Sequence, residues 1–172
     1  MAILKAKRFI LRPLRKGDEF SLQRNINDKA IYSYTAAIPY PYSLKTARKW
    51  IQENLRRERQ KKRSDLHFAI VINDEAGGSI GLNKIEGHKT EIGYWLGRNY
   101  WGKGIMSEAV AMLTKFAFNK LKLRRLSASV FEHNSASAKV LEKNGYKQEG
   151  FLRKYHLKDG KFHNAKLYAK VR

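Results

Sequence analysis

The fold is decided by one stretch of the chain, Glu91-Ile92-Gly93-Tyr94-Trp95-Leu96-Gly97-Arg98-Asn99-Tyr100-Trp101-Gly102-Lys103-Gly104-Ile105. Residues 90–96 predict a short strand, and an amphipathic helix is expected from Gly102 to about Leu121. Between them lies a loop that contains glycines and opens directly onto the helix. The free N–H groups and the dipole at a helix N-terminus favour an anion. The stretch therefore predicts a strand–loop–helix unit that binds an anion.

Three residues of this loop suit a phosphate. Gly102 and Gly104 have no Cβ, so the backbone can approach a phosphate closely, and Lys103 adds a positive charge. Two glycines at this spacing also occur in ordinary strand–helix turns, and that alternative stays open for the bare pattern. The loop is not a P-loop, because no Gly-Lys-Ser/Thr follows the required spacer. It is not a dinucleotide-binding fingerprint either, because the third glycine is missing.

The rest of the chain supplies elements for a mixed sheet. Its 172 residues suggest one domain, residues 1–172, without repeats or linkers. Asp18 and Ser43 are expected to be the N-caps of two helices, and Asn144-Gly145 to end another. The expected strands are residues 8–14, 66–73, 79–85, 90–96, 125–131 and two more that pair across an Asp159-Gly160 turn; the remaining helices are 102–121 and 135–143, with loops at 34–42 and 74–78. The resulting order, β-α-α-β-β-β-α-β-α-β-β, predicts one α/β (α+β) layer fold.

The composition is strongly basic. The 36 lysines and arginines outnumber the 15 aspartates and glutamates, which gives a net charge of +21. The densest basic runs are residues 56–63 and 120–125. Such a charge attracts anions such as RNA, acidic proteins or phosphorylated cofactors, although a solvated face explains each run equally well.

Several classes of chemistry are excluded by composition. The chain has no cysteine, so disulfides, thiolate catalysis and an acyl-cysteine intermediate are excluded. The five histidines show no metal-ligand spacing, so no metal is predicted. The longest unbroken apolar run, residues 68–72, is far shorter than a membrane span, and the N-terminus lacks a signal-peptide core. We therefore expect a cytoplasmic protein without a membrane segment.

The loop and a second segment together resemble a known family. Residues 99–104 are similar to the Gln/Arg-x-x-Gly-x-Gly/Ala signature of the GNAT superfamily of N-acetyltransferases, with Asn99 where Gln or Arg is preferred. The second signature follows at the expected distance in Asn134-Ser135-Ala136-Ser137 and Val140-Leu141-Glu142-Lys143-Asn144-Gly145-Tyr146. Residues 91–96 and 100–109 resemble the ribosomal-protein N-acetyltransferase subgroup. The resemblance covers nearly the whole chain and implies a GNAT-type twisted mixed, mostly antiparallel sheet flanked by helices on both faces.

The resemblance also implies acetyl-CoA as the cofactor. It would lie between the strand that ends at Leu96 and the strand 125–131, with its pyrophosphate on the glycine loop. Asn134 would hold the pantetheine arm or a water, and Lys143 would meet the 3′-phosphate unless it is only a solvated helix residue. The implied cofactor-binding residues are Tyr94, Trp95, Leu96, Asn99, Trp101, Gly102, Lys103, Gly104, Ile105, Met106, Asn134, Ser137 and Lys143.

Acetyl transfer to an amine needs a base, because an ammonium ion has no lone pair with which to attack. Glu91 on the cofactor strand and His156 on the penultimate strand are the two candidates, and both are also explained as ordinary surface residues. Many family members place a tyrosine acid where this chain has Leu141. The subgroup resemblance points instead to Ser137, whose hydroxyl would hydrogen-bond the sulfur or orient a water.

The acceptor is the least determined part of the prediction. The tyrosine-rich loop predicts that Tyr34, Tyr40 and Tyr42 wall the acceptor pocket, with packing on the core as the alternative. We expect direct attack of an amine on acetyl-CoA, and the resemblance favours a protein N-terminal amine, as on a ribosomal protein. The basic surface would then contact RNA or an acidic protein. The alternative acceptor is a small-molecule amine such as an antibiotic. The alternative function is that of a non-catalytic RNA- or ribosome-binding module. The sequence is compatible with both a monomer and a homodimer.

Overall fold

The structure is a computed structural model that describes residues 3–60 and 63–172. Positions 61 and 62 of the basic run 56–63 lie outside the described residues. The elements in chain order are β1 (Leu4–Lys5), β2 (Ile10–Pro13), α1 (Asp18–Ile26), α2 (Lys29–Ser33), α3 (Leu44–Glu58), β3 (Leu66–Ile72), β4 (Glu75–Glu86), β5 (Lys89–Leu96), a 3-10 turn (Arg98–Tyr100), α4 (Ile105–Asn119), β6 (Arg125–Phe131), α5 (Ser135–Lys143), β7 (Lys147–Lys158) and β8 (Lys161–Val171).

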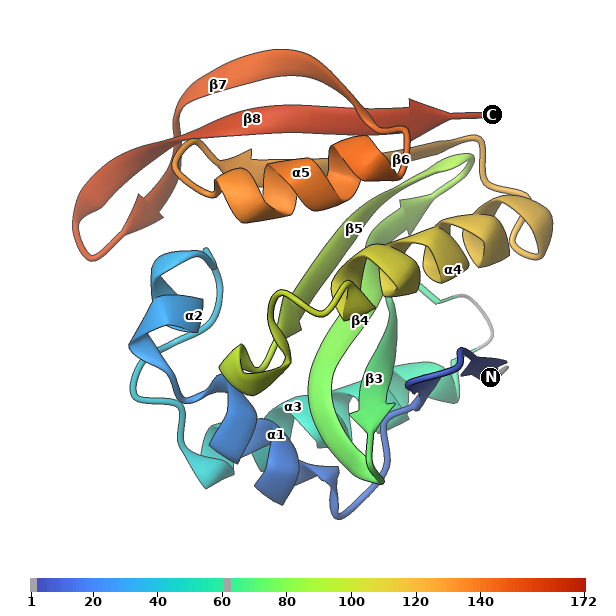
Figure 1. The fold of residues 1–172 in the computed structure, drawn as a ribbon, viewed down its shortest axis with the longest axis vertical. Helices are drawn as coiled ribbons and strands as arrows, with labels where there is room; N and C mark the ends of the chain where they lie inside the picture. The colour runs from blue at the N-terminus through green and yellow to red at the C-terminus, as the bar shows by residue number, and fades with distance from the viewer. Residues whose placement is uncertain (1–2, 61–62) are drawn as a thin grey trace.

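The strands form one sheet in the order β1-β2-β3-β4-β5-β6-β8-β7. Every neighbouring pair is antiparallel except β5 and β6, which run parallel. A parallel pair needs a long crossover connection, and α4 supplies it. Figure 1 shows β5 and β6 side by side at one end and diverging toward the end where α2 lies. The mixed, mostly antiparallel sheet confirms the expected fold class.

Helices cover both faces of the sheet. α4 and α5 pack on one face in the largest core cluster, which contains Leu113, Leu126 and Leu141. α1 and α3 pack on the opposite face through Leu22 and Ile51. Burying one apolar side of each helix against the sheet supplies the main stabilisation of such a layered fold.

The turn between β3 and β4 is tighter than expected. Asn73 and Asp74 have φ angles of 48° and 64°, and Ile72 pairs directly with Glu75. Two central residues with positive φ make the two-residue hairpin turn that matches the twist of the strands. The predicted turn at residues 74–78 is therefore wrong, because residues 75–78 already belong to β4.

Asp18 is not the N-cap of α1. Gly17 occupies that position with a φ of 97°, and Asp18 is the first helical residue. Its buried carboxylate accepts two hydrogen bonds of 2.7 Å from the guanidinium of Arg12 and one of 2.9 Å from the N–H of Arg15. The carboxylate therefore joins the helix to β2 instead of capping helix amides.

The other predicted boundaries mostly hold. Ser43 is confirmed as the N-cap of α3, since its Oγ accepts the N–H of Thr46 at 3.1 Å. β6, α5 and the Asp159-Gly160 turn lie where they were expected. α4 begins at Ile105 and not at Gly102, because the N-cap is Gly104. The sequence did not predict β1 or α2. In the described ranges, no helix is both long and apolar enough to cross a membrane.

Candidate active site

The distinctive feature of the sheet is the point at which β5 and β6 separate. Their pairing runs only from Lys89 with Arg125 to Glu91 with Ser127. Beyond it β5 continues to Leu96 and β6 to Phe131. We call residues 92–96 and 128–131 the splay. In the splay, the two strands carry backbone groups that do not bond each other in the described chain.

The direction of these backbone groups follows from the β4–β5 ladder. The N–H of Gly97 donates to the carbonyl of Gly77 at 2.8 Å, on the β4 side. Backbone groups of successive residues in a strand point to opposite sides, so those of Tyr94 and Leu96 point toward β6. The indole Nε1 of Trp101 donates to the carbonyl of Leu96 at 2.7 Å and occupies that acceptor. The N–H and carbonyl of Tyr94 and the N–H of Leu96 remain for an extended ligand.

The register sorts the side chains of the splay onto two faces. Residues directly opposite on neighbouring strands share a face, as do alternate residues of one strand. Glu91 lies opposite Ser127, and Phe131 follows on the same face, which α1 and α3 cover farther along the sheet. Tyr94 points to the other face, where it packs with α4 and α5. The two faces therefore offer different side chains to a ligand in the splay.

The loop before α4 leaves its backbone open. Gly102 and Gly104 have φ angles of 72° and 73°, and a Cβ added to Gly102 would meet nothing within 4 Å. No described side chain caps α4, so the N–H groups of its first turn remain available to an anion. Lys103 is exposed beside them, whereas the side chains of Ile105 and Met106 are buried and offer only backbone N–H groups.

A second cation lies at this loop that the sequence pattern did not single out. Nη1 of Arg8 donates to the carbonyl of Lys103 at 2.5 Å, and its Nη2 lies 3.5 Å from the carboxylate of Glu108. Arg8 thereby fastens the loop and adds positive charge next to Gly104. It is 95 positions away from Lys103 in the chain, so only the fold brings the two together.

Ser137 meets Tyr94 across the splay. The hydroxyl of Tyr94 on β5 lies 2.8 Å from the hydroxyl of Ser137 in the first turn of α5. Burial raises the pKa of Tyr94 well above its usual value, so the phenol stays protonated. Oδ1 of Asn134 accepts the N–H of Ser137 at 3.1 Å and caps α5. The sequence predicted a role only for the backbone of Tyr94, and the contact of its hydroxyl arises from the packing of α5 beside β5.

Two further predicted cofactor residues are exposed. Asn99 lies on the 3-10 turn, and Lys143 lies in the last turn of α5. The neighbouring Asn144 donates to the carbonyl and the hydroxyl of Ser107 at 3.1 and 3.3 Å. These contacts place the C-terminal end of α5 against the first turn of α4, so Lys143 is near the open loop.

Glu91 and His156, the two candidate bases, lie on the same face and interact electrostatically. Burial, followed by the nearby His163, lowers the pKa of His156, and the carboxylate of Glu91 acts in the opposite direction. Glu91 is 40% exposed, and the ammonium of Lys84 lies 3.7 Å from its carboxylate. A neutral imidazole and a carboxylate thus lie on the face of the sheet opposite to Tyr94 and Ser137.

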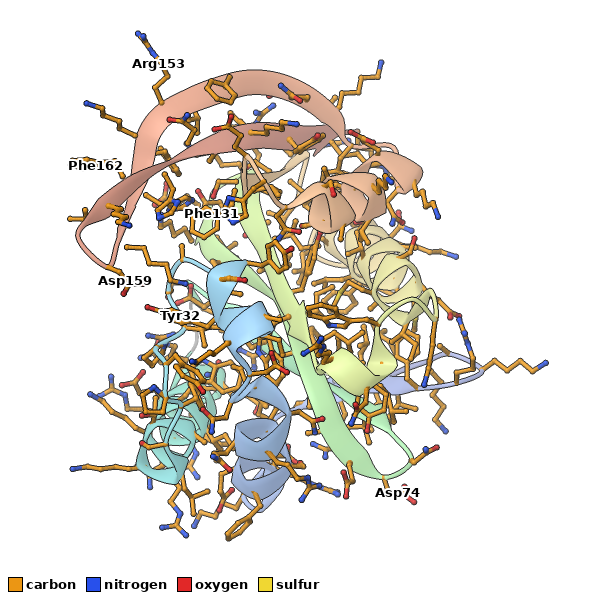
Figure 2. The ribbon with its side chains drawn as sticks, turned by 60° about the vertical axis from the view of Figure 1, so that its left-hand side comes forward. Tyr32, Asp74, Phe131, Arg153, Asp159 and Phe162 are labelled. Carbon is orange, nitrogen blue, oxygen red and sulfur yellow. The ribbon has the colours of Figure 1, made fainter. Side chains whose placement is uncertain are left out.

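Aromatic rings surround these groups. His133, His156 and His163 have ring centroids 5.4, 5.0 and 5.3 Å from that of Phe131, which Figure 2 labels at the end of β6. The ring of Tyr34 lies 5.7 Å from His133, between that cluster and Trp101. Phe131, His133 and His163 were not predicted as site residues, because their ring cluster forms only when β6, β7 and β8 pair.

The three loop tyrosines have different surroundings. Tyr34 is partly exposed beside the aromatic cluster, and the ring of Tyr40 is tilted against that of Tyr32, with 5.7 Å between the ring centroids. Tyr42 is only 6% exposed and belongs to a core cluster with Ala47, and burial raises its pKa to about 12. For Tyr42 the packing alternative is therefore correct, and it does not wall a pocket.

The arrangement fits a long, thin cofactor that ends in phosphates. The open backbone of Tyr94 and Leu96 suits a strand-like amide arm, and the start of α4 with Lys103 and Arg8 suits a pyrophosphate. Among residues 3–60 and 63–172 there is no group of three His, Cys, Asp or Glu side chains that could hold a metal ion.

Comparisons with known proteins agree with this geometry. Residues 8–147 match the family described as the acetyltransferase (GNAT) domain. The chain is 34% identical to "Uncharacterized N-acetyltransferase p20" of Bacillus licheniformis over 98% of this chain and 96% of that protein. It is 35% identical to "Ribosomal-protein-serine acetyltransferase" of Escherichia coli over 60% and 59% of the two chains.

A solved structure with the same fold contains the nucleotide cofactor. It is described as "RimL- Ribosomal L7/L12 alpha-N-protein acetyltransferase in complex with Coenzyme A", with a TM-score of 0.89 and 24% identity over 99% of this chain and 98% of that chain. The family match covers residues 8–147, and the relative from Bacillus licheniformis is similar over 98% of this chain. This chain therefore belongs to the GNAT family of N-acetyltransferases.

Proposed function

We propose that this protein transfers the acetyl group of acetyl-CoA to the N-terminal amine of a polypeptide. The observation that carries the proposal is the splay of β5 and β6, with the uncapped N-terminus of α4 at one end and candidate bases on the opposite face. When bound, acetyl-CoA supplies a thioester whose carbonyl carbon is open to attack by a neutral amine.

The chain's own residues would hold the cofactor in two places. The N–H and carbonyl of Tyr94 and the N–H of Leu96 would bond the amide arm. The N–H groups of residues 102–106, with Lys103 and Arg8, would bind the pyrophosphate. Trp101 would orient the backbone of Leu96 through its indole bond. Asn134 would act through the position of Ser137, which it caps.

A base on the face of α1 and α3 would take the proton from the acceptor amine. His156 suits this task because its lowered pKa keeps the imidazole neutral near pH 7. Glu91 would accept the proton directly or through a water, or would orient the resulting imidazolium. On the opposite face the hydroxyl of Ser137, held by Tyr94, would hydrogen-bond the sulfur.

The choice of a polypeptide amine rests on the relatives and on charge. Two of the proteins that this chain resembles are described as acetyltransferases of ribosomal proteins. The net charge of +21 repels free polyamines and attracts ribosome-bound or acidic partners. A small antibiotic-like amine is the competing acceptor, and an RNA-binding role without catalysis is the competing function.

Mass spectrometry tests the proposal directly. The protein would be incubated with acetyl-CoA, a pool of peptides with free N-termini and a pool of small amines. We expect acetylation of peptide N-termini and release of one thiol for each acetyl group transferred. Acetylation confined to small amines would contradict the acceptor class. Salt-dependent RNA binding by a protein that neither binds nor consumes acetyl-CoA would contradict the enzymatic function.

A further inference from the structure

We propose that Lys158 is a positioning residue for the acceptor: it holds residues 32–35 across the splay and so completes the wall against which the acceptor binds. This inference rests on the proposed function and assigns a role to the tip of the β7–β8 hairpin. We call residues 32–35 the strap. Figure 2 shows Asp159, at the hairpin tip, close to Tyr32.

Two adjacent residues of the hairpin, Lys158 and Asp159, form hydrogen bonds with the strap. The ammonium of Lys158 donates to the carbonyl of Tyr32 and, at 2.6 Å, to the carbonyl of Thr35. It also lies 3.5 Å from the centroid of the Tyr32 ring. Asp159 accepts a hydrogen bond of 2.5 Å from the hydroxyl of Tyr32. All three of these hydrogen bonds have a charged partner, and Lys158 makes two of them together with the ring contact, so Lys158 is the main contact of the hairpin with the strap.

The chemistry of the strap explains why it binds a cation. The strap contains the C-terminal end of α2, where carbonyl groups lack the partner four residues on that a longer helix would supply. The carbonyl of Tyr32 accepts the N–H of Thr35 at 3.2 Å, and a carbonyl oxygen has a second lone pair for a cation. The face of a tyrosine ring adds negative potential at the same point. Burial lowers the pKa of Lys158, which agrees with an ammonium that has exchanged water for these carbonyls and this ring.

The same strap touches both sides of the splay. Nε2 of His133 lies 3.2 Å from the carbonyl of Ser33, and the amide of Asn134 lies 3.5 Å from the carbonyl of Tyr34. The Tyr34 ring lies 6.5 Å from Trp101 in the loop before α4. The strap therefore runs from the cofactor loop to the end of β6, beside the rings around Phe131.

Lys158 is thus connected to the acceptor side without facing the reacting atoms itself. If its ammonium is removed, the strap loses its main contact with the hairpin and Tyr34 loses its fixed place beside His133. The Arg8 bond at the start of α4 and the β4–β5 pairing that holds Tyr94 lie outside the strap, which approaches the cofactor loop through the ring of Tyr34, 6.5 Å from Trp101. Removal of the ammonium should therefore weaken binding of the acceptor much more than binding of acetyl-CoA.

The test compares Lys158→Met with Lys158→Arg and Lys161→Met. Methionine keeps most of the aliphatic stem without the charge, arginine restores a cationic donor, and Lys161 is exposed on the same hairpin. With a synthetic peptide that the wild type acetylates, we expect Lys158→Met to raise the acceptor KM about tenfold or more, the loss of a charged hydrogen bond. Its kcat should change much less, and its Kd for acetyl-CoA should stay within about twofold, well below that loss. Lys158→Arg should recover part of the effect, and Lys161→Met should behave as the wild type.

Hydrogen exchange provides a second readout on the same proteins. The N–H groups of Tyr34 and Thr35 donate to the carbonyls of Ile31 and Tyr32 at 3.1 and 3.2 Å. Their exchange should accelerate in Lys158→Met and not in Lys161→Met. An unchanged acceptor KM, or a lower one, overturns the proposal whatever the exchange result. A wild type that acetylates none of the amines overturns the proposed function instead, and the two failures are thereby distinguished.

Discussion

The hydroxyl of Tyr94 lies 2.8 Å from the hydroxyl of Ser137, and the two residues stand on opposite sides of the splay. Tyr94 comes from β5, and Ser137 comes from the first turn of α5, which follows β6. The bond therefore fixes the serine relative to the cofactor strand. A serine held in this way is a better hydrogen-bond donor to a sulfur than a freely rotating one, because its rotamer is already selected.

Ser137→Ala should lower kcat by about tenfold or more, because one hydrogen bond to the departing sulfur is worth roughly that factor. The Kd for acetyl-CoA should change much less. Steady-state kinetics with the peptide acceptor measures the first quantity, and isothermal titration measures the second.

The matched control for this variant is Ser135→Ala, which changes an exposed serine in the same turn of α5. Tyr94→Phe should reproduce part of the loss, because Ser137 is then no longer held. If Ser137→Ala and Ser135→Ala have the same kcat, Ser137 has no role in the transfer.

Gly102→Val should weaken acetyl-CoA binding by at least about tenfold, because a branched side chain at a φ of 72° is strained and would project into the open loop. Equilibrium binding of acetyl-CoA measures the effect, and circular dichroism checks that the fold remains.

Gly87→Val is the control that separates the effect of backbone strain from the effect of blocking the cofactor loop. Gly87 also has a positive φ, 57°, and also has open space around it, but it lies in the turn between β4 and β5. The Gly87→Val variant should lose about as much stability as Gly102→Val and should bind acetyl-CoA as the wild type does. Equal affinity of the Gly102 variant and the wild type would remove the loop from the cofactor site.

The pH dependence of kcat/KM distinguishes the two bases. If neutral His156 takes the proton, activity falls as pH drops through its pKa, which lies below 6.5. His163→Ala removes a neighbour that lowers this pKa, so the acidic limb should move to higher pH. Glu91→Gln removes a carboxylate that raises it, so the limb should move to lower pH. Loss of activity at every pH in Glu91→Gln, with a normal profile in His156→Ala, would identify Glu91 as the base.

Arg12→Met should lower the free energy of unfolding by about 3–5 kcal/mol, because the buried carboxylate of Asp18 would lose its two short guanidinium bonds and keep as its cation the exposed guanidinium of Arg15, 3.7 Å away. Arg24→Met is the matched control. Arg24 also makes a 2.7 Å ion pair, with Glu75, but their side chains are 60% and 50% exposed. Loss of this exposed ion pair should lower the free energy of unfolding by less than about 1 kcal/mol. Urea denaturation measures both, and equal values for the two variants would contradict the role given to burial.

Much of the fold could be predicted because its signals are local. The periodicity of residues 125–143 predicted β6 and α5 with their observed bounds, and Ser43 acts as the N-cap that its type and place indicate. Asp18 could not be predicted in the same way. Aspartate is a good cap, but the nearby Arg12 offered a stronger bond, and only the pairing of β2 with its neighbours brings that arginine within reach.

The sequence by itself determined the family resemblance, the strand–loop–helix unit and the place of its glycines, because hydrogen-bond directions and φ preferences depend on neighbouring residues. Tertiary structure alone decided which side chains meet. It placed Arg8 at the start of α4, gathered three histidines around Phe131, buried Tyr42 and brought Lys158 onto the strap. These contacts join residues that are far apart in the chain, and their geometry is set by strand order and register, which no local pattern encodes.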